Sequence, residues 1–316
     1  MDRRCASSSW TRSRLPSKEI KPSCMHSLSR VLTAAKTVGL LALASCLLPV
    51  CVARAEIQLT FGLYSSKKPT DMVKLYRPLL NQLESALAAK LGEPVVIQLQ
   101  VAKTYEEGSQ SVIDGTFDIS QLGPVSYIQL KEKQAGVSLL AIEGTKGRKA
   151  LQGVICVLSN AIAGSIKDLR GKKFAFGDQY STTGRYSSQM YLAENGITAK
   201  DLGTFNYLER HDKVGAAVAA GDYDAGALNE RTFKKMVEDG SPLRALARFP
   251  IDGRPWVSKA GLDPRIQAAL KDALININDP KALAALGEEN LVFLPGTDAD
   301  FEATRKAIRE NGRFIK

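Results

Sequence analysis

Short apolar runs alternate with helical patterns from about residue 57 onward, and this alternation constrains the fold more than any other feature of the sequence. In the first part of the chain, strands are predicted at 57–64, 95–102, 117–123 and 137–144. Helices are predicted at 72–90, from just after Thr104 to about 114, and after the Gly123-Pro124 turn. Parallel strands need a long crossover connection, usually a helix. The order therefore predicts a parallel sheet covered by helices.

A second series of the same kind follows. Its predicted strands lie at 153–160, 172–178, 222–228 and 243–250. The last of these strands is expected to stop at Pro250, and no linker rich in Pro, Gly or Ser separates the two series. The long apolar runs at 153–159 and 243–250 are instead expected to continue from one sheet into the next. Two such crossovers make a hinge, and a hinge can close on a ligand.

The predicted fold class is thus α/β, with two lobes that share a cleft. The expected division of the chain is a leader at 1–55, lobe one at 56–152 plus 250–316, and lobe two at 153–249.

Positive charge is concentrated in the first 55 residues. The whole chain carries a formal charge of +10, but nine of its 43 Lys and Arg residues and only two of its 33 acids lie in this segment. Residues 56–316 therefore carry a net charge of only +3. A nearly neutral body offers no field for a phosphate backbone, so nucleic acid is not an expected partner.

The leader has the pattern of a secretory signal peptide. A basic stretch begins at Met25, the apolar run TVGLLALASCLLPVCV follows, and Ala53-Arg54-Ala55 forms an A-x-A cleavage signature. The apolar run is too short for a stable membrane span. We expect translation to begin at Met25, cleavage after Ala55 and a periplasmic product. The alternative is a lipoprotein anchored at Cys46, because Leu43-Ala44-Ser45-Cys46 resembles a lipoprotein box.

Four of the five cysteines lie in the leader, and only Cys156 remains in the exported part. It stands inside the apolar run GVICVL, where a lone cysteine behaves as a small hydrophobic residue. No disulfide is expected.

Three consecutive hydroxyl residues, Ser181, Thr182 and Thr183, stand between the predicted strand at 172–178 and a helical pattern that runs to Glu194. Ligands of α/β sheets lie at the carboxyl ends of strands, beside the N-termini of helices, where free N–H groups attract anions. One hydroxyl is enough to cap a helix. Three offer more donors than capping needs and suit a tetrahedral oxyanion, although a cap with solvent contacts is the alternative.

Other candidate residues lie at comparable strand and helix ends. His211 opens a helical pattern, Tyr105 begins another, Tyr64 ends the first strand, and Glu230 follows the strand at 222–228. His211 has a structural role as its alternative, and Glu230 can simply begin the next helix, where the helix dipole favours acids. The exported part has no second histidine and no cysteine pair, so no metal site is expected.

No enzyme motif is present: the sequence lacks a G-x-S-x-G elbow, a P-loop, a G-x-G-x-x-G and an H-E-x-x-H. Ser181 and His211 could form a nucleophile and base, with Asp212 or Asp224 as the orienting acid. Three adjacent hydroxyls are more typical of a cradle for an anion than of a single activated nucleophile, so we expect neither catalysis nor a cofactor.

Taken together, these segments resemble one family. DLRGKKFAFGDQYSTTG at 168–184, His211-Asp212 and AVAAGDYDAGAL at 217–228 are similar to the substrate-binding proteins of phosphate, phosphite and phosphonate ABC transporters. The resemblance extends over roughly 56–275. In the first half it includes Thr104-Tyr105, G-x-F-D at Gly115 to Asp118, and the Gly123-Pro124 turn.

The resemblance implies a two-lobed periplasmic-binding-protein architecture with two hinge crossovers. It also implies a phosphorus oxyanion held by Ser181, Thr182 and Thr183, with His211 and Tyr105 completing the site. Members that accept aminophosphonates place acids around the ammonium group, whereas this chain has Glu230-Arg231 and Asp252-Gly253-Arg254 there. Basic residues at these positions disfavour an ammonium and favour phosphate, phosphite or a simple or acidic phosphonate. The candidate ligand residues are Ser181, Thr182, Thr183, His211, Tyr105, Tyr64, Glu230 and Arg254.

The expected function is capture of the oxyanion for an ABC permease, by a protein that works as a monomer. The alternative is a sensor of the same fold that presents its ligand-bound form to a membrane histidine kinase or receptor.

Overall fold

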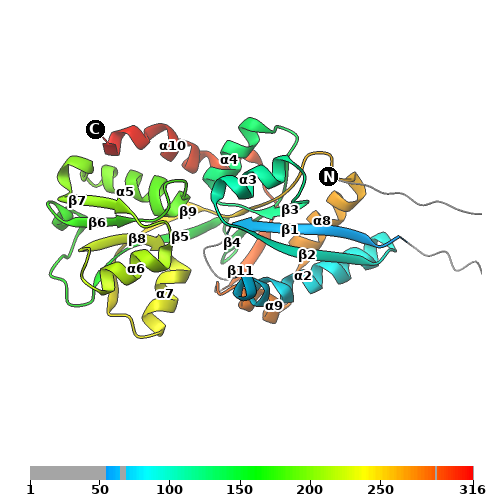
Figure 1. The fold of residues 1–316 in the computed structure, drawn as a ribbon, viewed down its shortest axis with the longest axis horizontal. Helices are drawn as coiled ribbons and strands as arrows, with labels where there is room; N and C mark the ends of the chain where they lie inside the picture. The colour runs from blue at the N-terminus through cyan, green and yellow to red at the C-terminus, as the bar shows by residue number, and fades with distance from the viewer. Residues whose placement is uncertain (1–54, 65–68, 289, 316) are drawn as a thin grey trace, which may run out of the picture. The chain divides into compact units, whose positions relative to one another are not determined.

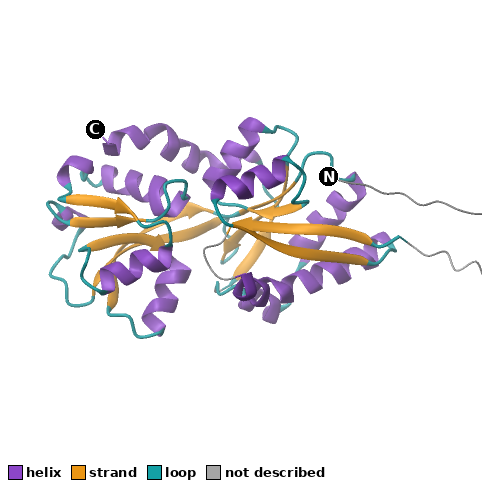
Figure 2. Ribbon diagram, viewed as in Figure 1, coloured by secondary structure: helices purple, strands orange, loops and turns teal. Residues whose placement is uncertain are grey.

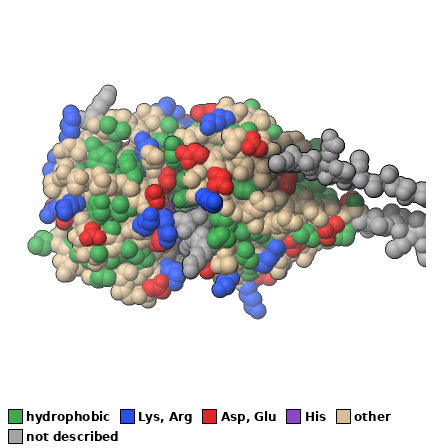
Figure 3. Space-filling view, viewed as in Figure 1, with side chains coloured by type: hydrophobic (Ala, Val, Ile, Leu, Met, Phe, Trp, Pro, Cys, Tyr) green, Lys and Arg blue, Asp and Glu red, His purple; other side chains and the backbone are tan. Residues whose placement is uncertain are grey.

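The computed structural model describes residues 55–64, 69–288 and 290–315. The predictions about Met25, Cys46 and the signal peptide fall on residues outside these ranges. Within the ranges, no helix combines the length and the apolar character that a membrane span requires. Figure 3 shows basic and acidic side chains interspersed on the viewed face, as a nearly neutral surface requires.

The first sheet has six strands in the order β11-β4-β10-β3-β1-β2. Its strands are β1 (Ile57–Tyr64), β2 (Val95–Ala102), β3 (Ile119–Gln121), β4 (Ser138–Thr145), β10 (Pro255–Ser258) and β11 (Leu291–Leu294). β1 pairs in parallel with β2 and β3, as predicted, but β10 pairs antiparallel with both β3 and β4. The sheet is therefore mixed, because the chain returns from the second lobe in the opposite direction and enters between two strands of the first (Figures 1 and 2).

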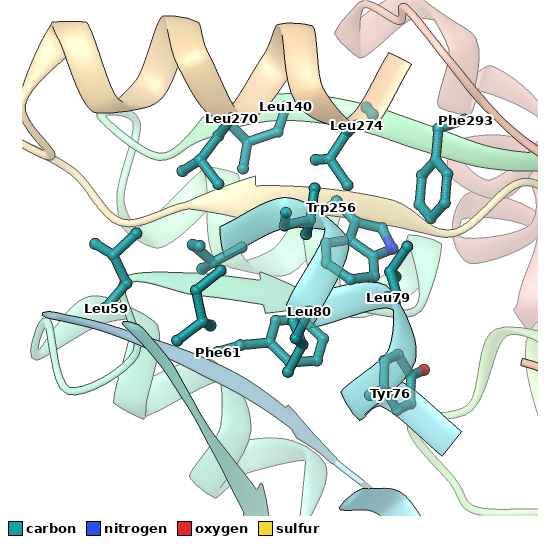
Figure 4. Close-up of a cluster of buried hydrophobic side chains, with 14 of the residues drawn as sticks. Leu59, Phe61, Tyr76, Leu79, Leu80, Leu140, Trp256, Leu270, Leu274 and Phe293 are labelled. Atoms are coloured by element: carbon teal, nitrogen blue, oxygen red, sulfur yellow. The ribbon is translucent and has the colours of Figure 1, made fainter. Parts of the chain in front are cut away.

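Helices on this sheet are α2 (Pro69–Leu91), α3 (Tyr105–Ile113), α4 (Pro124–Lys133), α8 (Pro264–Asn276) and α9 (Pro280–Ala285). α2 buries leucines at four-residue spacing against the sheet and α8. Trp256 of β10 stacks on Phe61 of β1 with ring centroids 4.6 Å apart. Figure 4 shows these rings among leucines, with Tyr76 at the margin of the cluster and its hydroxyl directed away from the apolar side chains. This core fixes α2, which forms part of the cavity described below, and β10, which directly follows Arg254 of the cavity wall.

The second sheet has five strands in the order β7-β6-β8-β5-β9. Its strands are β5 (Ala150–Leu158), β6 (Lys173–Phe176), β7 (Thr204–Tyr207), β8 (Ala225–Asn229) and β9 (Leu243–Asp252). Its helices are α5 (Ser188–Glu194), α6 (His211–Ala219) and α7 (Glu230–Glu238), with short 3-10 turns η2 (Ile166–Leu169) and η4 (Ala199–Asp201). Asp224, expected inside a strand, precedes β8 and accepts a hydrogen bond from the Lys173 N–H at 2.8 Å.

Two strand-to-strand connections join the sheets, β4 to β5 and β9 to β10. β9 does not stop at Pro250 but continues to Asp252. β9 is an edge strand, and at an edge the missing proline N–H costs no ladder bond. Gly253 follows, and a Cβ there would lie 2.0 Å from the Glu143 carbonyl oxygen, so only glycine fits where the two connections touch.

After β11, a short turn η5 (Asp298–Phe301) leads into α10 (Glu302–Ile315). Phe314 of α10 belongs to the core of the second sheet, while Ala307 packs between Val125 of α4 and Tyr186 of the second lobe. The sequence-based division assigned all of 250–316 to lobe one. The terminal helix instead contacts both lobes, because its apolar face reaches helices on each (Figure 1). We therefore propose that lobe one ends before α10.

Candidate functional site

A cavity of about 390 Å³ lies where the two lobes face each other, and both lobes supply its walls. Of the eight ligand residues predicted from the sequence, all of which the structure describes, seven line this cavity: Ser181, Thr182, Thr183, His211, Tyr105, Tyr64 and Arg254. These residues are far apart in the sequence, and strand and helix ends bring them together. Their role in binding remains a prediction.

The hydroxyl turn, defined here as Ser181–Thr183, follows β6 and opens the helical segment predicted to continue to Glu194. The first six residues form a π-helix, η3 (Thr182–Ser187), rather than an α-helix. The Ser181 carbonyl accepts from the Tyr186 N–H, five residues on, at 3.3 Å, and the Ser181 hydroxyl caps the turn by accepting from the Gly184 N–H at 2.9 Å. Such π-segments are frequent at functional sites.

Two glycines allow this turn to fold back on the strand. A Cβ on Gly184 would lie 2.8 Å from the Gly177 Cα, so neither position has room for a side chain. The three hydroxyl side chains are only 3–6% exposed but line the cavity. The hydroxyl turn is thus held rigidly with its side chains toward the space between the lobes.

The hydroxyl turn also contacts the opposite lobe. The Val125 N–H, in the first turn of α4, donates to Thr182 Oγ1 at 3.0 Å. The N-cap of α4 is Gly123, which has no side chain that could accept a hydrogen bond from the first turn of the helix. A second contact between the lobes is the hydrogen bond between the Tyr105 hydroxyl and Ser181. The Val125 N–H of the first lobe therefore meets an acceptor of the second, at the N-termini of α4 and η3, where backbone N–H groups favour negative charge.

His211 is the first residue of α6, and its Nδ1 is inaccessible to solvent and has no hydrogen-bond partner among the described residues. Burial, together with the charges of Arg254 and Arg231, lowers the pKa of His211 to about 4. The imidazole is therefore neutral at pH 7 and has one N–H donor and one acceptor nitrogen. A buried polar atom without a partner is uncommon, and its place in the cavity wall points to a ligand.

Tyr64 and Tyr105 lie against each other on the first-lobe side, with ring centroids 4.1 Å apart. Burial, with the charges of Asp178 and Glu209, raises the pKa of Tyr64 to about 12. Burial also raises the pKa of Tyr105. Both phenols therefore remain protonated at any physiological pH and can donate to an anion.

The wall of the cavity also carries charged groups. Arg254 pairs with Glu143 at 2.9 Å and with Glu288 at 3.1 Å, and Glu143 also accepts from the Trp256 indole N–H at 2.7 Å. Burial alone would lower the pKa of Arg254, but the two carboxylates raise it, so the guanidinium stays charged. Arg254 thus reaches the cavity as a paired cation anchored in the core of the first lobe.

Tyr76, Gln121 and Arg231 line this wall but were not among the ligand residues predicted from the sequence, and neither was Glu143, which lies behind the wall and pairs with Arg254. Glu143 carries a signal in the sequence, because it interrupts the apolar run VSLLAIEG as a single buried acid. Tyr76 lies on α2 with no such signal. Arg231 was noted in the sequence as a basic residue next to Glu230, and the fold shows that it lines the cavity.

Glu230 was predicted as a ligand residue, and the structure places it elsewhere. It is not among the residues that line the cavity, and its carboxylate accepts from Arg248 Nε at 3.0 Å. It is the first residue of α7, where the helix dipole favours an acid. The next residue, Arg231, faces the cavity instead, because successive helix positions point in different directions.

A second hollow of about 350 Å³ lies on the other side of Tyr64, lined by Glu106 of the first lobe and by Asp178 and Glu209 of the second. Burial raises the pKa of Asp178, and the nearby charges of Glu106 and Glu209 raise it further, whereas a hydrogen bond from the Tyr180 N–H lowers it in part.

No group of three or more His, Cys, Asp or Glu side chains in the described ranges is placed to hold a metal.

The site therefore combines helix N-termini, hydroxyls, phenols and a neutral imidazole around one cavity, which suits a small oxyanion. Residues 61–301 match the family model described as "ABC transporter, phosphonate, periplasmic substrate-binding protein". The chain belongs to this family. It is a substrate-binding protein of an ABC transporter for phosphorus oxyanions and not an enzyme, and the resemblance seen in the sequence is confirmed.

Relatives and solved structures agree with this binding protein in length and fold. It is 24% identical over 282 residues to the phosphate-import protein PhnD of Mycolicibacterium smegmatis, which covers 80% of this chain and 86% of that protein. The phosphonates-binding periplasmic protein of Escherichia coli is 22% identical, with 78% and 74% covered. The structure of PhnD1 from Prochlorococcus marinus in complex with methylphosphonate superposes with a TM-score of 0.68 at 19% identity, covering 81% of this chain and 98% of that one. The predicted two-lobed α/β architecture is confirmed.

Proposed function

We propose that this binding protein captures its phosphorus oxyanion on the hydroxyl turn, between the lobes, and delivers it to an ABC permease. The observation that carries the proposal is the Val125 N–H contact with Thr182 Oγ1, because it brings the N-terminus of α4 and the hydroxyl turn, one from each lobe, together at the wall of one cavity. Names of relatives that refer to phosphate and phosphonates, and of a structural neighbour in complex with methylphosphonate, support the same ligand class.

Binding replaces neutral hydrogen bonds by charge-assisted ones. In the described structure, the Val125 N–H and the Tyr105 hydroxyl are bonded to Thr182 and Ser181. An oxyanion between the lobes accepts from these donors and from the imidazole of His211. Hydrogen bonds to charged groups are roughly twice as strong as neutral ones. The exchange therefore favours the ligand-bound, closed arrangement.

The test is isothermal titration calorimetry of the mature protein with phosphate, phosphite and methylphosphonate, with sulfate and acetate as comparison anions. We expect at least one phosphorus oxyanion to bind more tightly than either comparison anion. Thr182→Ala should weaken that binding by about 1–3 kcal/mol, the range for a hydrogen bond to a charged partner. Thr198→Ala makes the same chemical change outside the cavity, at the N-cap of η4, and should leave binding unchanged. Equal effects of the two substitutions would contradict the proposed site.

The proposal also includes export of the protein through a signal peptide. The basic leader followed by an apolar run and Ala53-Arg54-Ala55 supports a signal peptide cleaved after Ala55, with acylation at Cys46 as the alternative. We also propose that the protein works as a monomer, and the nearly neutral body supports a protein that does not bind nucleic acid. Mass spectrometry of the secreted protein distinguishes a free N-terminus at Glu56 from a lipid-modified Cys46.

A further inference from the structure

The cavity is larger than an inorganic oxyanion requires. At about 30 Å³ for each heavy atom, the share of one water molecule in the liquid, the five heavy atoms of phosphate fill about 150 Å³. The cavity holds about 390 Å³. Beyond the hydroxyl turn it continues between α2 and α7, lined there by Met72, Leu75, Tyr76, Arg231, Lys235 and Met236. More than half of the volume thus remains for a substituent on phosphorus, along walls that are partly apolar.

The acids that line this cavity are already engaged. Asp212 pairs with Arg210, and Asp239 pairs with Lys235 at 3.0 Å. Asp252 accepts from both the N–H and the hydroxyl of Thr304, at 3.0 and 2.8 Å. Glu143 and Glu288 lie behind the wall and are occupied by Arg254. None of these carboxylates is offered to an ammonium group on a ligand.

The cations that line the cavity differ in whether they have a carboxylate partner. Lys235 and Arg254 have carboxylate partners, as described above. Arg231 donates from Nη1 to the Leu286 carbonyl at 2.7 Å and is hydrogen-bonded to the Tyr76 hydroxyl, but within the described part of the chain it has no carboxylate partner. Its charge reaches the ligand site, because it contributes to the lowered pKa of His211. Arg231 is therefore the lining cation, among the described residues, that still lacks an anion.

We propose that the cavity takes an organophosphonate whose substituent ends in a carboxylate, with the phosphonate on the hydroxyl turn and the carboxylate on the guanidinium of Arg231. This proposal rests on the function proposed above and adds the chemical class of the substituent. Arginine is suited to the role because its planar fork donates two parallel hydrogen bonds to a carboxylate. Two of its neighbours, Tyr76 and the Leu286 carbonyl, hold the fork in place. Phosphonopropionate, with nine heavy atoms, fills about 270 Å³ on the same scale and fits.

The experiment compares three ligands that share the phosphonate and a three-carbon substituent: propylphosphonate, phosphonopropionate and aminopropylphosphonate. Calorimetry of the wild-type protein should give phosphonopropionate an affinity about 10- to 100-fold higher than that of propylphosphonate, as expected for a charge-assisted hydrogen-bonded pair. Aminopropylphosphonate should bind more weakly than propylphosphonate. Arg231→Gln should remove the advantage of the carboxylate, and Arg231→Lys should restore part of it.

The matched control is Arg248→Gln, which removes an arginine of the same lobe that does not line the cavity. It should preserve the ratio of the phosphonopropionate and propylphosphonate affinities. The proposal is overturned if the two ligands bind equally to the wild-type protein, if aminopropylphosphonate binds most tightly, or if the carboxylate keeps its advantage in Arg231→Gln. In each of these cases binding of the phosphonates still supports the proposed function. Failure of every phosphorus compound to bind contradicts the proposed function itself.

Discussion

Two sets of lining residues, named here the neutral end and the charged end, differ in how they present polarity. At the hydroxyl turn the groups are neutral: hydroxyls, phenols, backbone N–H groups and an imidazole whose pKa is lowered to about 4. The charged end consists of Arg254, which pairs with Glu143 and Glu288, and of Arg231, which donates to the Leu286 carbonyl. Neutral donors can hold an anion without a buried cation, so the binding energy does not have to offset the cost of removing a cation from water. Charged groups, by contrast, need permanent partners to be buried at all.

The two sets of residues therefore have different roles, ligand exchange and structural support. The neutral end can exchange partners when a ligand arrives, because its hydrogen bonds are made across the lobes and are individually weak. The charged end is part of the core of the first lobe, beneath Trp256 and Tyr76, and stays in place. Substitutions should therefore affect stability most at the charged end and ligand exchange most at the neutral end.

The largest effect is expected from Glu143→Ala, which breaks the charged end. Glu143 is 2% exposed and accepts from both Arg254 and Trp256. Its removal leaves the buried Arg254 with Glu288 as its remaining carboxylate among the described residues and takes the acceptor from the Trp256 N–H, so the free energy of unfolding should fall by about 3–5 kcal/mol. Urea denaturation measures it. The surface pair of Glu194 and Lys306 supplies the control, because Glu194→Ala should cost less than about 1 kcal/mol. A loss below 1 kcal/mol for Glu143→Ala would show that the charged end is not held by its ion pairs.

A smaller effect concerns His211 at the neutral end. Its pKa is about 4 in the folded protein and about 6.5 in the unfolded chain, so the unfolded state takes up the proton first as the pH falls. Stability therefore decreases between pH 6.5 and pH 4, by about 2 kcal/mol from pH 7 to pH 5. Urea unfolding of the wild-type protein and of His211→Gln at both pH values measures the difference. If the two proteins lose the same stability on acidification, His211 is not a neutral buried imidazole.

The smallest effect is expected at Glu230, which is next to Arg231 in the sequence but lies outside the cavity lining. Glu230 pairs with the half-exposed Arg248 and does not line the site. Glu230→Gln should change methylphosphonate affinity by less than about 0.5 kcal/mol, the scale of a surface substitution away from any binding group. Calorimetry with Thr182→Ala as the sensitive reference tests this. An effect as large as that of Thr182→Ala would return Glu230 to the ligand site.

Several elements of the fold and the site could be read from the sequence. Strands such as 57–64 and 95–102 were placed to the residue, because their apolar runs are bounded by clear turn signals. The hydroxyl turn was identified because three hydroxyl residues exceed what one helix cap needs. The mixed pairing of β10 was not foreseen, since a returning strand of four residues carries no mark of its direction. The path of β9 past Pro250 was not foreseen either, because only the sheet order reveals an edge strand.

What the sequence determined by itself was local: which segments are strands or helices, where hydroxyl and histidine side chains follow strand ends, and that the body is nearly neutral. Apolar periodicity and turn chemistry act over a few residues, and so they can be read along the chain. Only the tertiary structure decided that Arg231 and not Glu230 faces the cavity, that Thr182 meets α4, and that Glu143 lies behind Arg254. These contacts join residues that are up to 111 positions apart or depend on the rotation of a helix, and long-range packing alone fixes both.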